Sequence, residues 1–352
     1  MITPSFYPAV GGVETHVRRV SACLTEAGHQ VAVLTHADLP SQERLGSLVV
    51  HRLPKTGWAT AWRLARPHLG WAEVVHCHDT YSYLHFCLPS RWLPPRRPVF
   101  ATFHGYESYP IPKEAIRWRQ FVSRRVRDAL CMGDFICKHY RIPCFAVSYG
   151  GVDPAPDPPP PPAEPSALFI GRLAEDTSIM AYLEALLRLR REHGYDLPVG
   201  IVGDGPLRPA AEKYVNANWI KATFHGVVAD PIPLLAACRY AFVSGYLAIW
   251  QALSLRRQVF ALYENPLKRD YLRGFPEAEK VMVIAADAGE LARSLARCVA
   301  EPALSGRMVE RGEALAAEHT WPRVAELYLA MYRKHMQRSA RHTSGGPPLG
   351  IA

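Results

Sequence analysis

Short apolar runs alternate along this chain with segments whose apolar residues recur every three or four positions. The first kind has the length of buried strands and occurs at residues 30–35, 48–53, 73–77, 98–103, 167–170, 197–205 (where a glycine-rich turn follows), 258–263 and 280–285. The second kind is typical of helices and occurs at residues 13–27, 116–130, 246–254, 287–299, 302–318 and 321–338. This alternation predicts an α/β protein with doubly wound parallel sheets, which bind ligands beyond the carboxyl ends of their strands.

A proline-rich segment at residues 154–165 divides this pattern into two parts. Proline interrupts helices and sheets, so the segment predicts a stiff, extended linker. We therefore expect domains at 1–153 and 166–319, a helix at 320–338 and a disordered tail at 339–352. Residues 1–8 resemble only the end of a first strand, so we expect the first domain to lack most of a central strand, through a late start or a truncation.

Composition narrows the classes of function. Of the 352 residues, 49% are hydrophobic, without an apolar run long enough to cross a bilayer. Eight cysteines are scattered without a Cys-x-x-Cys pair, which favours reduced thiols in a cytosolic protein. The net charge of +9 fits an arginine-rich surface, binding of anionic phosphates, or contact with an anionic membrane. No basic run is interleaved with aromatic residues, so nucleic acid is not an expected partner.

The stretch at residues 241–268 carries the clearest chemistry. It is predicted to form a strand, a tight Ser244-Gly245 turn, a helix, a second strand and a loop. A helix that opens directly after a strand presents free backbone N–H groups, which make an anion site. Gly11 and Gly12 precede another predicted helix and would allow the same close approach, although a plain strand–helix turn is the simpler interpretation.

Polar clusters follow two other predicted strands. His76 and His78 share a strand face, but no partner cluster has ligand spacing, so a metal site is not expected there. His104 follows the strand at 98–103, where either a ligand or a structural hydrogen-bond partner would satisfy it.

Six short motifs occur in a fixed order along the chain. They are Gly-Gly-Val-Glu at 11–14, His-Gly at 104–105, Gly-Val-Asp at 151–153, Gly-Arg-Leu at 171–173, Gly-Asp-Gly-Pro at 203–206 and Gln-Ala-Leu at 251–253. This order resembles the retaining, nucleotide-sugar-dependent glycosyltransferases of family 4 (group 1), from residue 5 to about residue 333. The resemblance implies the GT-B fold, in which two Rossmann-like domains face a cleft and a terminal helix crosses back to the first domain.

The resemblance also implies roles for individual residues. His104 would position the transferred sugar, Arg172 would clamp the donor pyrophosphate, and Gln251 would contact the donor ribose. Further donor contacts are implied for Gly11, Gly12, Gly203, Gly205, Val227, Gly245, Tyr246, Leu247, Asn265 and Lys268. Fixed cations and helix amides would neutralise the leaving diphosphate, so neither a metal nor another cofactor is expected. The implied reaction moves a hexose to a hydroxyl acceptor in cell-surface glycan or glycolipid synthesis.

Several positions depart from the family pattern. Val243 and Gln251 stand where glutamates are usual, and Thr177 stands where a lysine is usual. Lys268 or Arg269 is placed to supply the missing cation. An alternative hypothesis is therefore a homologue that binds nucleotide sugar or a partner protein without turnover. A nucleotide-sugar epimerase of the same fold is less favoured, because no acidic pair is placed for acid–base chemistry.

The helix predicted at 116–130 is rich in arginine. Its apolar face is expected to comprise Trp118, Phe121, Val122, Val126 and Ala129, with arginines around the rest. A solvated surface helix is the simpler interpretation. The sharper hypothesis is a patch that touches an anionic membrane and brings a lipid-linked acceptor to the site. The protein would then be cytoplasmic and peripheral on the inner face of the membrane.

Overall fold

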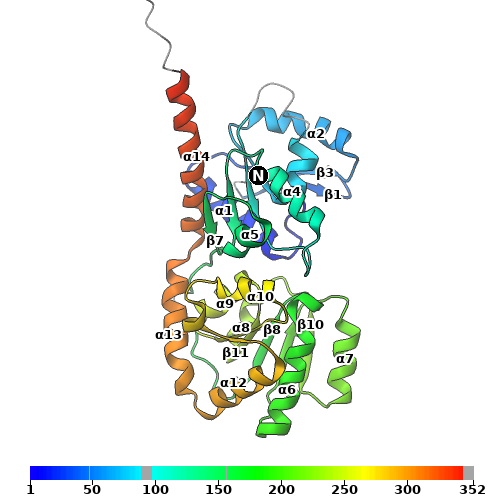
Figure 1. Cartoon of the computed structure of the whole chain (residues 1–352), viewed down its shortest axis with the longest axis vertical. Helices are drawn as coiled ribbons and strands as arrows, with labels where there is room; N and C mark the ends of the chain where they lie inside the picture. Colours follow the sequence, from blue (N-terminus) through cyan, green and yellow to red (C-terminus); the bar gives the residue numbers. More distant parts are fainter. Residues whose placement is uncertain (47, 89–96, 156, 344–352) are drawn as a thin grey trace, which may run out of the picture.

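The computed structural model describes residues 1–46, 48–88, 97–155 and 157–343. Two α/β units are stacked along the long axis of the molecule, and a long helix runs beside them (Figure 1). The first unit contains strands β1 (Ala32–Ala37), β2 (Ser41–Leu45), β3 (Leu48–Pro54), β4 (Val75–His78), β5 (Val99–Phe103), β6 (Ala129–Met132) and β7 (Ala146–Ser148). Its helices are α1 (Gly12–Glu26), α2 (Trp58–Trp71), α3 (Asp79–Ser82), the π-helical η1 (Tyr83–Cys87), α4 (Lys113–Ser123) and α5 (Asp134–Tyr140).

The second unit is a regular alternation of strands and helices. Its strands are β8 (Ala167–Ile170), β9 (Val199–Val202), β10 (Ala222–Gly226), β11 (Tyr240–Val243), β12 (Gln258–Leu262) and β13 (Met282–Ala285). Its helices are η3 (Glu175–Thr177, a 3-10 turn), α6 (Ile179–His193), α7 (Arg208–Ala217), α8 (Ile232–Ala236), α9 (Tyr246–Ser254), α10 (Pro266–Arg273), α11 (Ala278–Val281), α12 (Ala288–Ala300) and α13 (Ala303–Glu318). The final helix is α14 (Trp321–Thr343).

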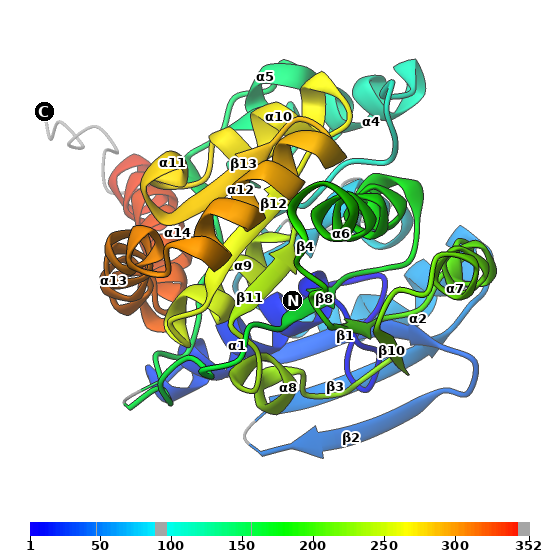
Figure 2. The same ribbon diagram turned by 90° about the horizontal axis from the view of Figure 1, so that it is seen from below.

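The second sheet confirms the predicted doubly wound architecture. Its six strands are parallel in the order β10-β9-β8-β11-β12-β13, with helices on both faces (Figure 2). In chain order this is 3-2-1-4-5-6, so the direction of winding reverses between β8 and β11. Open sheets of this kind bind ligands in the crevice at that reversal point.

The first unit has the same plan, with Ile2 at its centre. The sheets β1-β3-β2 and β4-β5-β6-β7 are joined by Ile2, which makes parallel bridges to Leu34 on one side and Cys77 on the other. The Ile2 side chain is buried. The expected central strand is thus represented by a single bridging residue. Strand β2 is antiparallel and forms one edge.

The linker and the last helix connect the two units. No helix or strand is formed at 154–155 or 157–165, as the proline content predicts, and the buried Arg257 donates to the Pro159 carbonyl over 2.8 Å. Just before the linker, a Cβ at Gly151 would lie 2.9 Å from the backbone of Thr320, so only glycine allows this close approach.

Helix α14 packs along the first unit, against α1 (Figure 1). Its Trp321, Val324 and Met331 share a core cluster with Val20 and Leu24 of α1. The helix continues to Thr343, past the predicted start of the tail at 339, and residues 344–352 lie outside the described part of the chain. No helix among the described residues combines the length and apolar character needed to span a bilayer.

The arginine-rich helix differs from its prediction. Helix α4 ends at Ser123, and Ala129 belongs to strand β6, which pairs with β5. Trp118, predicted for the buried face, is exposed, whereas Arg119 is buried. The apolar run at the end of the predicted helix is therefore a sheet strand, because pairing with β5 satisfies its backbone.

Trp250 is the largest fully buried side chain and lies where the two units meet. Its indole N–H donates to the Tyr149 carbonyl of the first unit over 2.8 Å, and its ring stacks on His319 at 4.5 Å. We expect Trp250→Ala to lower the free energy of unfolding by about 3–5 kcal/mol, through lost burial and a cavity. Urea unfolding followed by circular dichroism measures this.

The matched control is Trp219→Ala, because Trp219 is 83% exposed. It should change the free energy of unfolding by no more than about 0.5 kcal/mol. Equal effects of the two substitutions would contradict the role of Trp250 at the junction.

Candidate functional site

The residues predicted to contact a donor gather at one edge of the six-stranded sheet. Arg172 follows β8, Gly203 follows β9, Val227 follows β10, Gly245 follows β11 and Asn265 follows β12. Because these strands are parallel neighbours, their carboxyl ends open on the same crevice.

Lys268 points to the start of α9. Asn265 caps α10 by accepting from the Lys268 backbone N–H over 2.8 Å, which fixes the first turn of the helix. The Lys268 ammonium donates to the Ser244 carbonyl over 2.7 Å and lies 4.4 Å from the centre of the Tyr271 ring. Burial lowers the pKa of Lys268 to about 8, opposed in part by the charge of Asp176. The Lys268 cation, which the sequence singled out, thus lies buried beside the start of α9.

Tyr271 occupies the amino terminus of α9. The Tyr246 backbone N–H donates to the Tyr271 hydroxyl over 3.0 Å, and the two rings stack at 4.0 Å. The phenol oxygen therefore takes one of the amides that the sequence assigned to the diphosphate. Sequence reasoning missed Tyr271. The available signal was its position three residues after Lys268, on the same face of α10.

Arg172 is arranged differently from the predicted clamp. Its guanidinium pairs with Asp176 in the same loop over 2.7 Å, and its side chain is 66% exposed. Thr177, in place of the usual lysine, donates to the Arg172 carbonyl, and the neighbouring Ser178 donates to Glu264 over 2.9 Å. The residues that replace the Lys-Gly pair thus tie the loop after β8 to the loop after β12.

The glycine turn after β9 serves close packing. A Cβ at Gly203 would lie 1.9 Å from the Gly171 carbonyl oxygen, and one at Gly205 would lie 2.5 Å from that of Leu173. Both glycines have positive φ, of 131° and 159°. The backbone requires glycine here even without a ligand. Next to this turn, the Val227 side chain is exposed beyond the end of β10.

Gln251 lies in the second turn of α9 and is half-buried. Within the described residues, its side-chain amide has no hydrogen-bond partner, so both its donor and its acceptor remain available. The position of the other usual glutamate, Val243, is fully buried in β11. Valine there contributes to the core and not to the crevice. On the same helix, Leu247 packs partly buried against the cluster around Trp321.

On the first unit, His104 lies at the end of β5 and already has a structural partner. Its Nε2 lies 3.0 Å from Nδ1 of His78, and its backbone N–H donates to Asp79 over 2.7 Å. Burial, and then the charge of Arg119, lower the pKa of His104 to about 3, so the imidazole is neutral. Its Nδ1 is the ring nitrogen left for a ligand. Gly11, also predicted to contact the donor, caps α1, with Gly12 as the first residue of that helix.

A buried hydrogen-bond network extends from this point to α14. His16 Nε2 lies 2.7 Å from the Tyr328 hydroxyl, which lies 2.8 Å from Thr102 Oγ1. Thr102 is 2.8 Å from His76 Nε2, and His76 Nδ1 is 2.8 Å from the Tyr332 hydroxyl. Both ring nitrogens of His76 are therefore occupied by hydroxyl groups, which accounts for this histidine without a metal.

Arg119 is a further residue that the sequence did not single out. It is buried, donates to the Gly105 carbonyl over 3.0 Å and to Glu107 over 3.1 Å, and lies 3.9 Å from the centre of the Tyr140 ring. It therefore fixes the turn that carries His104. Nothing in its local spacing distinguishes it from the surface arginines of α4.

The two units approach each other through aromatic residues. Tyr106, two residues after His104, lies 6.4 Å from Tyr271 across the cleft, centre to centre. Burial raises the pKa of Tyr106 to about 12, helped by the charge of Asp176 and opposed by that of Arg172. The His104 side of the first unit therefore faces the Lys268 side of the second.

Two α/β units that face a cleft, with a helix that opens at the reversal point of the second sheet, define a protein of the GT-B class. Residues 10–156 match the model of Glycosyltransferase Family 4. This match lies on the first unit, covers less than half of the chain, and agrees with the family that the motif order indicates.

Three known proteins illustrate the similarity. Alpha-D-kanosaminyltransferase of Streptomyces kanamyceticus is 27% identical over 180 residues, which are 48% of this chain and 46% of that protein. One subunit of the phosphatidylinositol N-acetylglucosaminyltransferase of Homo sapiens is 51% identical over 37 residues, 10% of this chain and 8% of that protein. The matches thus span less than half of these relatives. The structure of HepE of Anabaena in complex with UDP superimposes with a TM-score of 0.71 at 14% identity, covering 95% of this chain and 98% of that one.

The buried histidines make stability depend on pH. Burial lowers the pKa of His16, His76, His78 and His104. Below the unfolded value of about 6.5, the unfolded chain therefore binds more protons than the native one, and stability falls. Burial raises the pKa of Asp79 to about 6, so the native state binds one proton there more readily than the unfolded chain does. This single group offsets part of the loss of stability. We expect the thermal midpoint to fall steadily from pH 7.5 to 5.5, by about 2–4 °C for each kcal/mol lost.

Circular dichroism at each pH measures this midpoint. His16→Asn should reduce the slope, whereas His225→Asn, at an exposed position on β10, should leave it unchanged. A midpoint that does not change with pH would rule out uncharged burial of the histidines.

Proposed function

We propose that this protein is a retaining, metal-independent glycosyltransferase that moves a hexose from a nucleoside diphosphate sugar to a hydroxyl acceptor. The observation that carries the proposal is the buried Lys268 ammonium beside the start of α9, at the reversal point of the sheet. A fixed cation and a helix terminus stabilise a leaving diphosphate without a metal.

The bond between the anomeric carbon and the diphosphate oxygen would break, and the acceptor oxygen would bond to the same face of that carbon. The acceptor proton would pass to the departing diphosphate. Lys268 would take the developing negative charge, joined by Arg172 once it leaves Asp176. Movement of Tyr271 would free the Tyr246 amide for a phosphate oxygen. His104 would donate or accept through Nδ1 at a sugar hydroxyl, and Gln251 would hydrogen-bond the ribose.

The nucleotide of HepE makes UDP the first donor base to test. Backbone contacts near Val227 would meet the base, as in the family pattern. A uracil base presents a donor and an acceptor that a main chain can match.

A catalytically impaired homologue is the second candidate. It is favoured by Val243 and Gln251 at the usual glutamate positions and by the use of Thr177 in a loop contact. An assay that measures the release of UDP during donor hydrolysis and sugar transfer distinguishes the two candidates. Turnover by wild type supports the transferase, whereas turnover gained only on Gln251→Glu supports the impaired homologue.

We further propose that the acceptor is lipid-linked and that α4 contacts an anionic membrane from the cytoplasmic side. Arg117, Arg124 and Arg125 are exposed on and just after α4, next to the half-exposed Trp118. A basic, tryptophan-bearing surface of this kind fits an anionic lipid interface. One relative is named for a phosphatidylinositol acceptor, which agrees with this proposal.

Lys268→Met tests the donor site. Methionine keeps the buried stem and removes the charge, so we expect the rate of UDP release to fall about 100-fold or more. In wild type, diphosphate binding should weaken as the pH rises through about 8, where Lys268 loses its proton. Arg269→Met is the matched control, since Arg269 is a neighbouring cation whose side chain is 45% exposed. Equal losses in both variants would argue against a specific role for Lys268.

Sedimentation with vesicles containing phosphatidylserine tests the membrane contact. Replacing Arg117, Arg124 and Arg125 with Gln should weaken binding by about 100-fold, at about 1 kcal/mol for each charge removed. The same replacement at Arg191, Arg293 and Arg297, exposed on α6 and α12 of the second unit, should have little effect. Binding that is insensitive to salt or to both sets of substitutions would refute the membrane proposal.

A further inference from the structure

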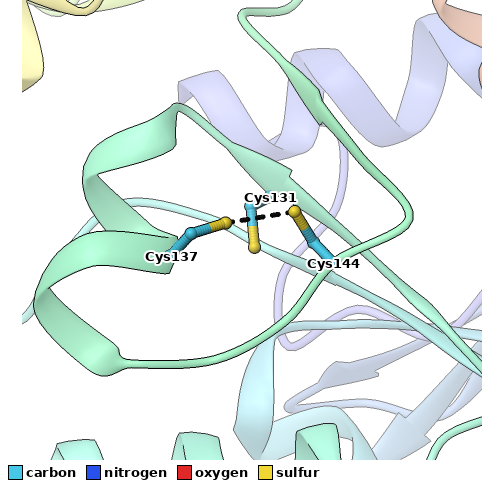
Figure 3. Close-up of side chains that lie close together, drawn as sticks. All are labelled: Cys131, Cys137 and Cys144. Atoms are coloured by element: carbon cyan, nitrogen blue, oxygen red, sulfur yellow. Dashed lines mark hydrogen bonds between the residues drawn. The ribbon is translucent and has the colours of Figure 1, made fainter.

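Three cysteine side chains converge beside strand β6. Cys131 lies on β6, Cys137 on α5, and Cys144 in the segment leading to β7. Their sulfur atoms all lie within 4.8 Å of one another, and those of Cys137 and Cys144 are 3.1 Å apart (Figure 3). Cys131 is buried and the other two are half-buried, so the cluster has a closed side and an accessible side.

The fold builds this convergence from rigid elements. Strands β6 and β7 are parallel neighbours, with Cys131 opposite Val147. Helix α5 follows β6 after one glycine, and its buried Ile136 precedes Cys137. Figure 3 shows the three sulfur atoms lying close together on side chains from three separate segments. A strand, a helix and a loop thus present three soft ligands to one point.

We propose that Cys131, Cys137 and Cys144 form a binding site for a thiophilic d10 metal ion, either Zn²⁺ or Cu⁺. Thiolates select these ions over hard cations such as Mg²⁺. A Zn–S bond of about 2.3 Å places sulfur ligands about 3.8 Å apart, so the Cys137–Cys144 pair needs to open by less than about 1 Å. Cu⁺ is satisfied by three thiolates, whereas Zn²⁺ needs a fourth ligand, which water can supply on the accessible side.

A disulfide is the competing use of these thiols. It would join only two of the three sulfurs, and the 3.1 Å pair would have to close to about 2.05 Å. A disulfide between Cys137 and Cys144 would leave the thiol of the buried Cys131 beside the S–S bond without a function. Convergence of all three sulfurs therefore favours a metal over a disulfide.

The position of the site gives the ion a structural role separate from the proposed chemistry. Lys138 and His139 follow Cys137 on α5, and both contact Asp270 of α10, over 2.6 and 2.9 Å. Helix α10 also carries Lys268. A metal that joins α5 to β6 would therefore steady the surface on which the donor-side helix rests, without contacting the donor.

Metal titration of the full chain tests the site. The protein is purified with a non-thiol reductant, treated with a chelator, and titrated separately with Zn²⁺ and with Cu⁺ against competing chromophoric chelators. Co²⁺ substitution reports thiolate ligation through its sulfur-to-cobalt charge-transfer band. We expect one equivalent of one of these ions per chain and a rise in the thermal midpoint on binding. Which ion outcompetes its chelator distinguishes the two.

Cys137→Ser is the test variant, because Cys137 is half-buried and its replacement spares the core. Its metal affinity should fall by more than the roughly 10–100-fold that loss of an outer hydrogen-bond partner costs. Cys238→Ser, a half-buried cysteine of the second unit, is the control and should bind as wild type does. The proposal is overturned if neither ion binds, if Cys137→Ser binds equally well, or if mild oxidation yields a Cys137–Cys144 disulfide in a chain that takes up no metal.

Discussion

A buried ammonium group is the constraint on which the donor side of this molecule depends. Lys268 is buried on α10, where its ammonium group contacts the Ser244 carbonyl and the face of the Tyr271 ring. The ammonium group has three N–H donors and a full charge, but its partners are only one carbonyl oxygen, one ring and the more distant Asp176. Burial with so few partners lowers the pKa of Lys268. An anionic ligand at this point would restore the missing compensation, which is why the site fits a diphosphate.

The two units are positioned by contacts that differ in kind. At the back of the cleft the contacts are apolar and aromatic, around Trp250 and its hydrogen bond to Tyr149. Along the outside, α14 brings Tyr328 and Tyr332 into the histidine network of the first unit. At the front, α5 and α10 meet through charged pairs with Asp270. These contacts hold Tyr106 of the first unit opposite Tyr271 of the second.

Sequence reasoning succeeded where the information was local. The strand–turn–helix at 241–268 has a strong period and a glycine turn, and the structure forms β11, α9 and β12 there. The placement of Lys268 followed from its position after β12. Helix α4 was predicted too long, because an apolar run of four residues continues a helical pattern as readily as it forms a strand. The buried state of Arg119 depends on the loop after β5, which no local pattern reveals.

The residues that were missed all depend on contacts between distant segments. Tyr271 caps a helix that begins 25 residues earlier, at Tyr246. The cysteines at 131, 137 and 144 have no familiar ligand spacing and meet only because β6, α5 and β7 fold together. Gln251 was singled out as a departure from the family pattern, and its role as a ribose ligand stays a prediction.

A crystal structure of this protein with UDP tests the role of Lys268 most sharply. We expect the diphosphate at the start of α9, within hydrogen-bond reach of the Lys268 ammonium, with the Tyr271 hydroxyl displaced from the Tyr246 amide. The ribose should lie beside Gln251. A nucleotide bound elsewhere would contradict a donor site at Lys268, as would a diphosphate that leaves the Lys268–Ser244 contact unchanged and makes no contact of its own with Lys268.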